Sequence, residues 1–163
     1  MLVMAKNTGK PSENAFEAAL NRLGKRAYYC RLVDAAEIFG RVGKTGNVRP
    51  QPSDYIITVD GVTSYAEVKS TTDETAFRFS LLRTKQTAAA RQILSAGGEY
   101  NVFVHHLPTD RWYRIPYSVI ATVQQTGKAS IKWHDLQDFQ WAINSTTSWS
   151  TLRQPEQTPL MRL

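Results

Sequence analysis

Two runs of β-branched and aromatic residues flank the dipeptide Asp60-Gly61, one over residues 54–59 and the other over residues 62–69. An Asp-Gly pair readily takes the positive φ angles of a two-residue type I′ turn, whose twist matches the strands on either side. The stretch therefore predicts a β-hairpin in which Val59 pairs with Val62. Because side chains alternate between the two faces of a strand, this register decides which residues share a face.

The predicted register sets two acidic side chains opposite each other. Counting outward from the turn, Asp54 pairs with Glu67. Side chains paired in this way have Cβ atoms roughly 4.5–5.5 Å apart, and like charges at that distance are unfavourable unless a positive group lies between them. Lys69 shares the face of Glu67, since it lies two residues further along the strand. A divalent cation with oxygen ligands suits such a patch.

The other face of the hairpin is apolar and is expected to face the core; its members are Tyr55, Ile57, Val59, Val62, Ala66 and Val68. The alternative to a metal site is a solvated hairpin that carries Glu67 and Lys69 as ordinary surface charges. Most isolated Glu-x-Lys triplets are of that kind. An aspartate in register with the glutamate favours the metal site.

Length and composition bound the class of protein. The chain has 163 residues, 42% of them hydrophobic, which predicts one domain over 1–163 with its core at about 12–143. No apolar run approaches the roughly 20 residues needed to cross a bilayer, so no membrane partner is expected. The single cysteine, Cys30, excludes an internal disulfide and predicts a reducing, cytoplasmic setting. A net charge of +6 favours a polyanionic partner.

The N-terminal part predicts a basic arm over residues 1–11 and then a helix from about Glu13 to Lys25, capped by Ser12. Glu17 lies on the flank of the apolar stripe of this helix and is a candidate to overhang the sheet. Its alternative is an ordinary boundary carboxylate. Glu13 falls in the first turn, where attraction to the helix dipole explains it more simply.

Residues 34–51 mix glycines with Arg41, Lys44 and Arg49 and predict a basic loop. Gly43-Lys44-Thr45 lacks the glycine five positions earlier that a phosphate-binding P-loop needs, and it lacks the strand–loop–helix context. A nucleotide cofactor is therefore not expected. Contact with nucleic acid and a solvated linker remain equally good interpretations of the loop.

The remaining pattern completes the fold. Strands are expected over 27–33, 77–79, 100–107, 112–115 and 131–133, with helices over about 82–96 and 117–125 and a surface tail over 144–163. Gln86 falls inside the apolar stripe of the helix at 82–96; it either bonds backbone or reaches the carboxylate patch. The order of elements predicts an α/β (α+β) layout with a mixed central β-sheet flanked by helices.

With Pro52-Ser53-Asp54 followed by Glu67-Val68-Lys69, the hairpin resembles the PD-(D/E)XK nuclease superfamily, apart from the extra Ser53. The resemblance implies a restriction-endonuclease-like core and an Mg²⁺-dependent endonuclease, with Mn²⁺ able to substitute. It implies that Asp54, Glu67 and the backbone carbonyl of Val68 bind the metal. Lys69 would assist the attacking water.

The order of parts over about residues 12–117 is similar to Holliday-junction resolvases of the archaeal and RecU-like kind, with Glu17 and Gln86 added to the catalytic set. That likeness implies a homodimer acting on four-way DNA junctions. Phosphate contacts are expected from basic side chains: Arg22, Arg41, Lys44, Arg49, Arg78, Arg83 and Lys85. A restriction or repair nuclease acting on duplex or flap DNA, and a non-catalytic DNA-binding module, remain the alternatives.

Overall fold

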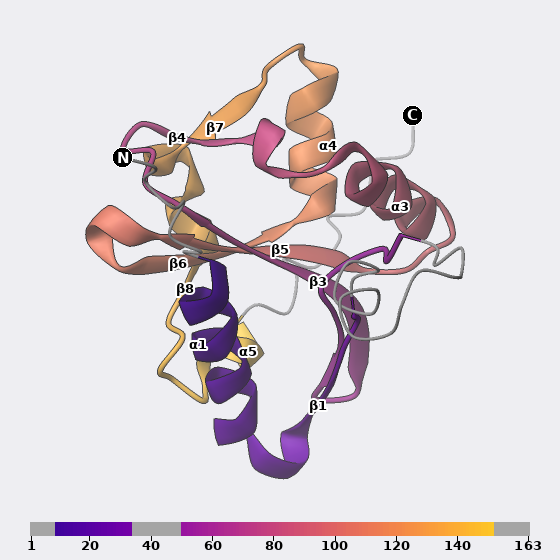
Figure 1. Ribbon diagram of the computed structural model, residues 1–163, viewed down its shortest axis with the longest axis vertical. Coiled ribbons are helices and arrows are strands. Elements are labelled where there is room, and N and C mark those ends of the chain that lie inside the picture. Colours follow the sequence, from indigo (N-terminus) through magenta and orange to yellow (C-terminus); the bar gives the residue numbers. More distant parts are fainter. Residues whose placement is uncertain (1–8, 34–49, 152–163) are drawn as a thin grey trace, which may run out of the picture.

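The computed structural model describes residues 9–33 and 50–151, and their centre is a six-stranded sheet with the strand order β1-β2-β3-β5-β6-β8 (Figure 1). β3 and β5 run parallel, and every other neighbouring pair in this sheet is antiparallel. The strands are β1 Ala27–Arg31, β2 Tyr55–Val59, β3 Val62–Thr71, β5 Tyr100–His106, β6 Arg111–Pro116 and β8 Gln140–Trp141. The expected mixed sheet is confirmed.

Helices cover both faces of this sheet (Figure 1). They are α1 Gly9–Arg22, α3 Thr84–Ser95, α4 Tyr117–Gln125 and the short α5 Ser148–Thr151. Two further strands, β4 Ala76–Arg78 and β7 Ser130–Lys132, pair with each other in a small separate sheet. Short 3₁₀ turns lie at Gly24–Arg26, Phe79–Leu81, Leu107–Thr109 and Trp133–Phe139.

Two apolar cores result, one on each face of the sheet. On one face the buried stripe of α1, which includes Phe16 and Leu20, packs against the inward residues of β2 and β3. On the other face α3, α4 and the small sheet pack over Val102 and Val104 of β5. β3 and β5 therefore lie between two covered faces, as parallel pairs generally do.

The β2–β3 hairpin has the predicted register, with Val59 opposite Val62 and Tyr55 opposite Ala66. Asp60 and Gly61 both have positive φ, 50° and 82°, as a type I′ turn requires. The apolar face is buried as expected except for Val62, which is 42% exposed. Val62 adjoins the turn at the tip of the hairpin.

The helix α1 begins earlier than predicted, at Gly9, so part of the expected basic arm is helical. Ser12, expected to cap the helix, lies inside it instead. Its buried hydroxyl is 2.9 Å from Nδ1 of His105 on β5, which satisfies the hydroxyl within the fold. Glu13 consequently lies beyond the first turn, and the dipole explanation for it is wrong.

The prediction of a surface tail over residues 144–163 is wrong at Trp149, which is buried. Trp149 on α5 is 5% exposed and packs with Trp141 and Phe103 in the core beneath α1. A tryptophan buries a large apolar area, which outweighs the polar composition around it. The two-residue strand β8 was not predicted either, because so short a run carries no periodic signal.

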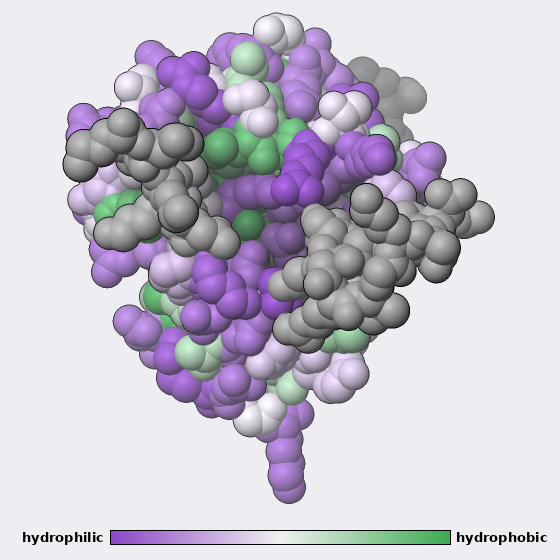
Figure 2. Space-filling model, viewed as in Figure 1, coloured by the Kyte–Doolittle hydropathy of each residue, from purple (hydrophilic) through white to green (hydrophobic). Residues whose placement is uncertain are grey.

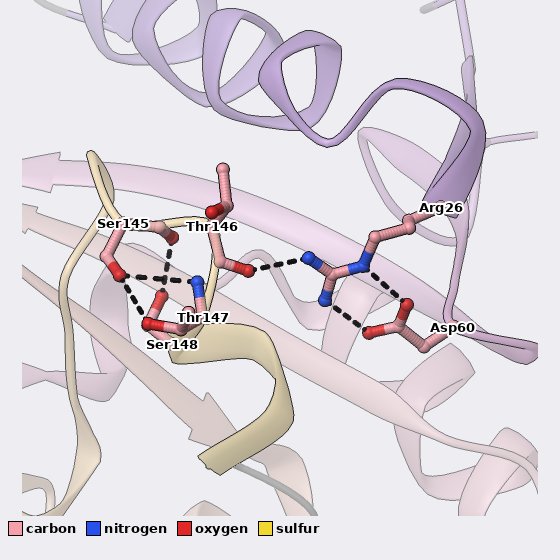
Figure 3. A network of polar contacts seen from close by, with 6 residues as sticks. All are labelled: Arg26, Asp60, Ser145, Thr146, Thr147 and Ser148. Carbon is pink, nitrogen blue, oxygen red and sulfur yellow. Dashed lines mark hydrogen bonds and ion pairs between the residues drawn. The ribbon is translucent and has the colours of Figure 1, made fainter.

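Arg26 connects the turn of the β2–β3 hairpin to this C-terminal segment (Figure 3). Its guanidinium forms a bidentate pair with Asp60 at 2.9 and 2.8 Å and donates to the carbonyl of Thr146 at 2.9 Å. Ser148 in turn bonds the carbonyl of Ser145 at 3.1 Å. The hairpin tip is thereby attached to the C-terminal segment. Within the described residues, no helix is long and apolar enough to cross a membrane.

Candidate active site

A cavity of about 740 Å³ opens where α1 begins, where the β2–β3 hairpin has its base and where α3 begins. The face drawn in Figure 2 is predominantly hydrophilic and is hollowed near its centre. Charged and amide side chains from these elements and from the end of β1 line the cavity: Glu13, Asp54, Arg31, Lys69, Arg83, Lys85 and Gln86. The cavity thus combines acidic and basic groups within one space.

Asp54 lies immediately before β2, one residue outside the paired ladder. Its carboxylate Oδ2 accepts a hydrogen bond from the backbone N–H of Val68 at 2.8 Å, across the hairpin. Its backbone carbonyl accepts from the N–H of Leu32 at 2.8 Å. The first bond holds the carboxylate against β3, beside the position that the predicted register gave it, and the second holds the backbone next to the end of β1.

Glu67 on β3 is fully buried, and its two carboxylate oxygens have different surroundings. Oε1 lies 2.6 Å from Nζ of Lys69 and accepts a hydrogen bond from Nε2 of Gln86 at 2.6 Å. Oε2 is buried with no hydrogen-bond partner. Burial and the neighbouring charge of Asp54 raise the pKa of Glu67 to about 7, although Lys69 opposes the rise.

Gln86 is held in place by the start of α3. Its Oε1 accepts a hydrogen bond from the backbone N–H of Arg83 at 3.0 Å, in the manner of a capping box. Its amide nitrogen is therefore left to face Glu67. Both interpretations of this glutamine therefore hold: its Oε1 bonds the backbone of Arg83 and its Nε2 reaches the carboxylate patch.

These residues suit a divalent cation. A buried carboxylate oxygen without a partner is costly, and a second carboxylate nearby raises the cost further. A hard cation between Asp54 and Glu67 removes both penalties, because it accepts oxygen ligands from each. Over the described residues no group of three or more His, Cys, Asp or Glu side chains converges. Further ligands would be the carbonyl of Val68 and water.

The structure brings Glu13, not Glu17, to the cavity. The two glutamates lie one turn apart on α1, and the cavity is at the N-terminal end of that helix. Glu17 accepts a hydrogen bond from the hydroxyl of Tyr55 at 2.7 Å, which fits the boundary interpretation. Glu13 pairs with Arg31 at 3.1 Å and with Lys10 at 3.6 Å.

The expected phosphate-binding residues divide into three groups. Arg83 and Lys85 are exposed and line the cavity. Arg22 instead donates to the carbonyl of Ile143 at 3.0 Å, and Arg78 pairs with Asp73 at 2.6 Å. Arg41, Lys44 and Arg49 lie outside the described residues.

Arg31 was missed by the sequence reasoning, although it lines the cavity. It is the last residue of β1 and pairs with Tyr55, the residue that follows Asp54 in the sequence. Only the pairing of β1 with β2 brings it to the site, and the pattern of a short strand with poor alternation does not reveal that pairing.

A mixed sheet with an aspartate at the start of one hairpin strand and Glu67-Val68-Lys69 on the other defines a nuclease of the PD-(D/E)XK class. Residues 41–150 match the family model described as Recombination protein U. The chain belongs to this family of Holliday-junction resolvases.

The fold has a counterpart among solved structures, Archaeoglobus fulgidus Hjc, described as a Holliday junction resolvase from an archaeal hyperthermophile. The TM-score is 0.52 with 18% sequence identity, over 78% of this chain and 91% of that chain. At this identity the likeness shows the fold. No curated protein matches the sequence.

Proposed function

We propose that this chain is an Mg²⁺-dependent endonuclease that resolves four-way DNA junctions in the cytoplasm, with Mn²⁺ able to replace Mg²⁺. The observation that carries the proposal is the partnerless, buried Oε2 of Glu67 near the carboxylate of Asp54, which lines a cavity that also presents cationic side chains. Membership in the Recombination protein U family supplies the junction as substrate.

In this proposal Asp54, Glu67 and the carbonyl of Val68 hold the metal. The metal supplies Lewis-acid activation of water and stabilises the charge that builds up on the phosphate. Lys69 is paired with Glu67 Oε1 and reaches the cavity with a side chain that is 18% exposed. It therefore is placed to orient the attacking water and to stabilise the hydroxide. Gln86 fixes which oxygen of Glu67 remains open.

Arg83 and Lys85 contact DNA phosphates at the mouth of the cavity, since both are exposed there. Contacts of this kind position DNA without selecting a base sequence, which suits an enzyme that selects branched shape. Two symmetric cuts across a junction need two active sites, so the working form is a homodimer.

The test is cleavage of labelled four-way junction, flap and linear duplex by the purified protein, with and without Mg²⁺. We expect paired nicks in the junction only with metal, and no cleavage by Asp54→Asn. The matched control is Asp138→Asn, which neutralises an exposed aspartate that does not line the cavity. Equal cleavage of all three DNAs would assign the chain to duplex or flap processing. Binding without cleavage would make it a non-catalytic module.

A further inference from the structure

Tyr100, the first residue of β5, has a fixed position close to the carboxylates of Glu67 and Asp54. It is 2% exposed and lies opposite Tyr65 of β3 in the parallel ladder. The rings of Tyr100 and Tyr65 are stacked with centroids 6.4 Å apart, and the ring of Tyr117 meets Tyr100 edge-on at 5.8 Å. With neighbours on two sides, the ring of Tyr100 can present its hydroxyl in one direction only.

The hydroxyl of Tyr100 donates a hydrogen bond to the backbone carbonyl of Pro52 at 2.8 Å. Pro52 lies two residues before Asp54, in the irregular stretch that leads into β2. Ser53 fixes the following turn, since its hydroxyl donates to the carbonyl of Tyr55 at 2.8 Å. The segment that carries Asp54 is therefore attached to the core through the Tyr100 hydroxyl, in addition to the cross-hairpin bond to Val68.

The surroundings of the hydroxyl explain why its proton goes to Pro52. Burial and the charges of Glu67 and Asp54 raise the pKa of Tyr100, so the hydroxyl stays protonated beside both carboxylates. A phenol has a single proton to donate. The bond to the Pro52 carbonyl uses that proton, and Oε2 of Glu67 is buried without a hydrogen-bond partner.

We propose that Tyr100 is a positioning residue for the metal site: it holds the Pro52 carbonyl so that Asp54 faces Glu67, and it leaves Oε2 of Glu67 open to the cation. This inference rests on the proposed function. Without the hydroxyl, the stretch before β2 loses its attachment to the core, and the Asp54 carboxylate must be ordered when metal binds. Removal of a residue that orients a metal ligand without touching the metal typically weakens metal affinity 10–100-fold.

The experiment compares Tyr100→Phe with Tyr117→Phe. Tyr117 is fully buried in the same core, but its hydroxyl is 3.4 Å from Oε1 of Gln124 on α4 and makes no bond to Pro52. For wild type and each variant, Mn²⁺ affinity is obtained from the rise of Tm with Mn²⁺ concentration, since a ligand of the folded state raises Tm by mass action. We expect on the order of tenfold weaker Mn²⁺ binding for Tyr100→Phe and wild-type binding for Tyr117→Phe.

A second readout is the metal concentration that gives half-maximal junction nicking, which should rise for Tyr100→Phe and be overcome by excess Mn²⁺. Wild-type Mn²⁺ affinity in Tyr100→Phe overturns the role of Tyr100 alone. An equal weakening in Tyr117→Phe also overturns it, because the effect would then be a general loosening of the core. If Mn²⁺ does not raise the Tm of the wild type, or raises the Tm of Asp54→Asn equally, the metal site itself is overturned, and both proposals fail with it.

Discussion

Gln86 Nε2 donates to Glu67 Oε1 at 2.6 Å, and this bond joins the first turn of α3 to the most deeply buried carboxylate of the site. The bond fixes the orientation of a carboxylate whose other oxygen has no partner. The helix start and the candidate active site are thus parts of one arrangement.

Replacement of Gln86 by Ala should lower junction cleavage 10–100-fold, because Glu67 loses the group that orients it. Loss of this hydrogen bond to a charged group should also cost about 1.5–3 kcal/mol of stability. The control is Gln92→Ala, which truncates an exposed glutamine on the same helix. Cleavage rate and chemical denaturation of both variants provide the check. A matched loss of stability with unchanged cleavage would make Gln86 purely structural.

Glu67 should make the metal-free protein less stable as pH rises. Its folded-state pKa is raised from 4.5 to about 7, so the folded state holds a proton that the unfolded state releases near pH 4.5. The resulting stability is fully present below pH 4.5 and is lost as pH rises through 7. In Glu67→Gln this loss should disappear, which leaves the variant more stable than wild type at pH 8 by on the order of 3 kcal/mol.

The measurement is denaturant unfolding of both proteins in a chelating buffer at a series of pH values. Glu74→Gln is the control, since Glu74 is an exposed acid near the end of β3. Added Mg²⁺ should restore wild-type stability at pH 8 and leave Glu67→Gln little changed. Parallel pH profiles for wild type and Glu67→Gln in the absence of metal would contradict the raised pKa.

The β2–β3 hairpin could be predicted from the sequence because its information is local. Asp60-Gly61 fixes the turn, the turn fixes the register, and the register brings Asp54 beside the strand that carries Glu67. Gln86 followed from helical periodicity, which is equally local. Both depend on a few neighbouring residues and on strong backbone preferences.

Other parts of the site depend on contacts between distant segments and were not predictable. The start of α1 is fixed in part by the bond between Ser12 and His105, which are 93 positions apart in the chain. Without that start, Glu13 cannot be distinguished from Glu17. The hydrogen bond from Tyr100 to Pro52 spans 48 positions and leaves no periodic signal. The core position of Trp149 likewise depends on aromatic rings of other strands.

The sequence predicted Glu17 as the helix carboxylate of the site, but Glu13 lines the cavity in its place. The expected effects of the two substitutions are therefore reversed. Glu13→Gln should lower junction cleavage more than Glu17→Gln, since only Glu13 lines the cavity. Glu17→Gln should reduce Tm slightly by weakening the bond to Tyr55. Both variants remove one negative charge from the same helix face, so each controls for the other. A larger loss of cleavage for Glu17→Gln, at comparable Tm, would restore the original assignment.

The last prediction concerns which cations contact DNA. Arg83 and Lys85 line the cavity, and Arg22 and Arg78 lie outside it. Arg83→Ala/Lys85→Ala and Arg22→Ala/Arg78→Ala remove the same net charge. Only the first pair should weaken junction binding strongly.

Each lost phosphate contact reduces the slope of log affinity against log salt by roughly 0.9 on duplex DNA. The cavity pair should therefore flatten that slope by nearly 2, and the other pair should leave it near the wild-type value. Junction binding titrated at several salt concentrations, with Asp54→Asn present in every protein to prevent cleavage, gives the slopes. Equal flattening in both double variants would mean that the basic surface acts through its total charge, and that these two cavity residues contact no particular phosphates.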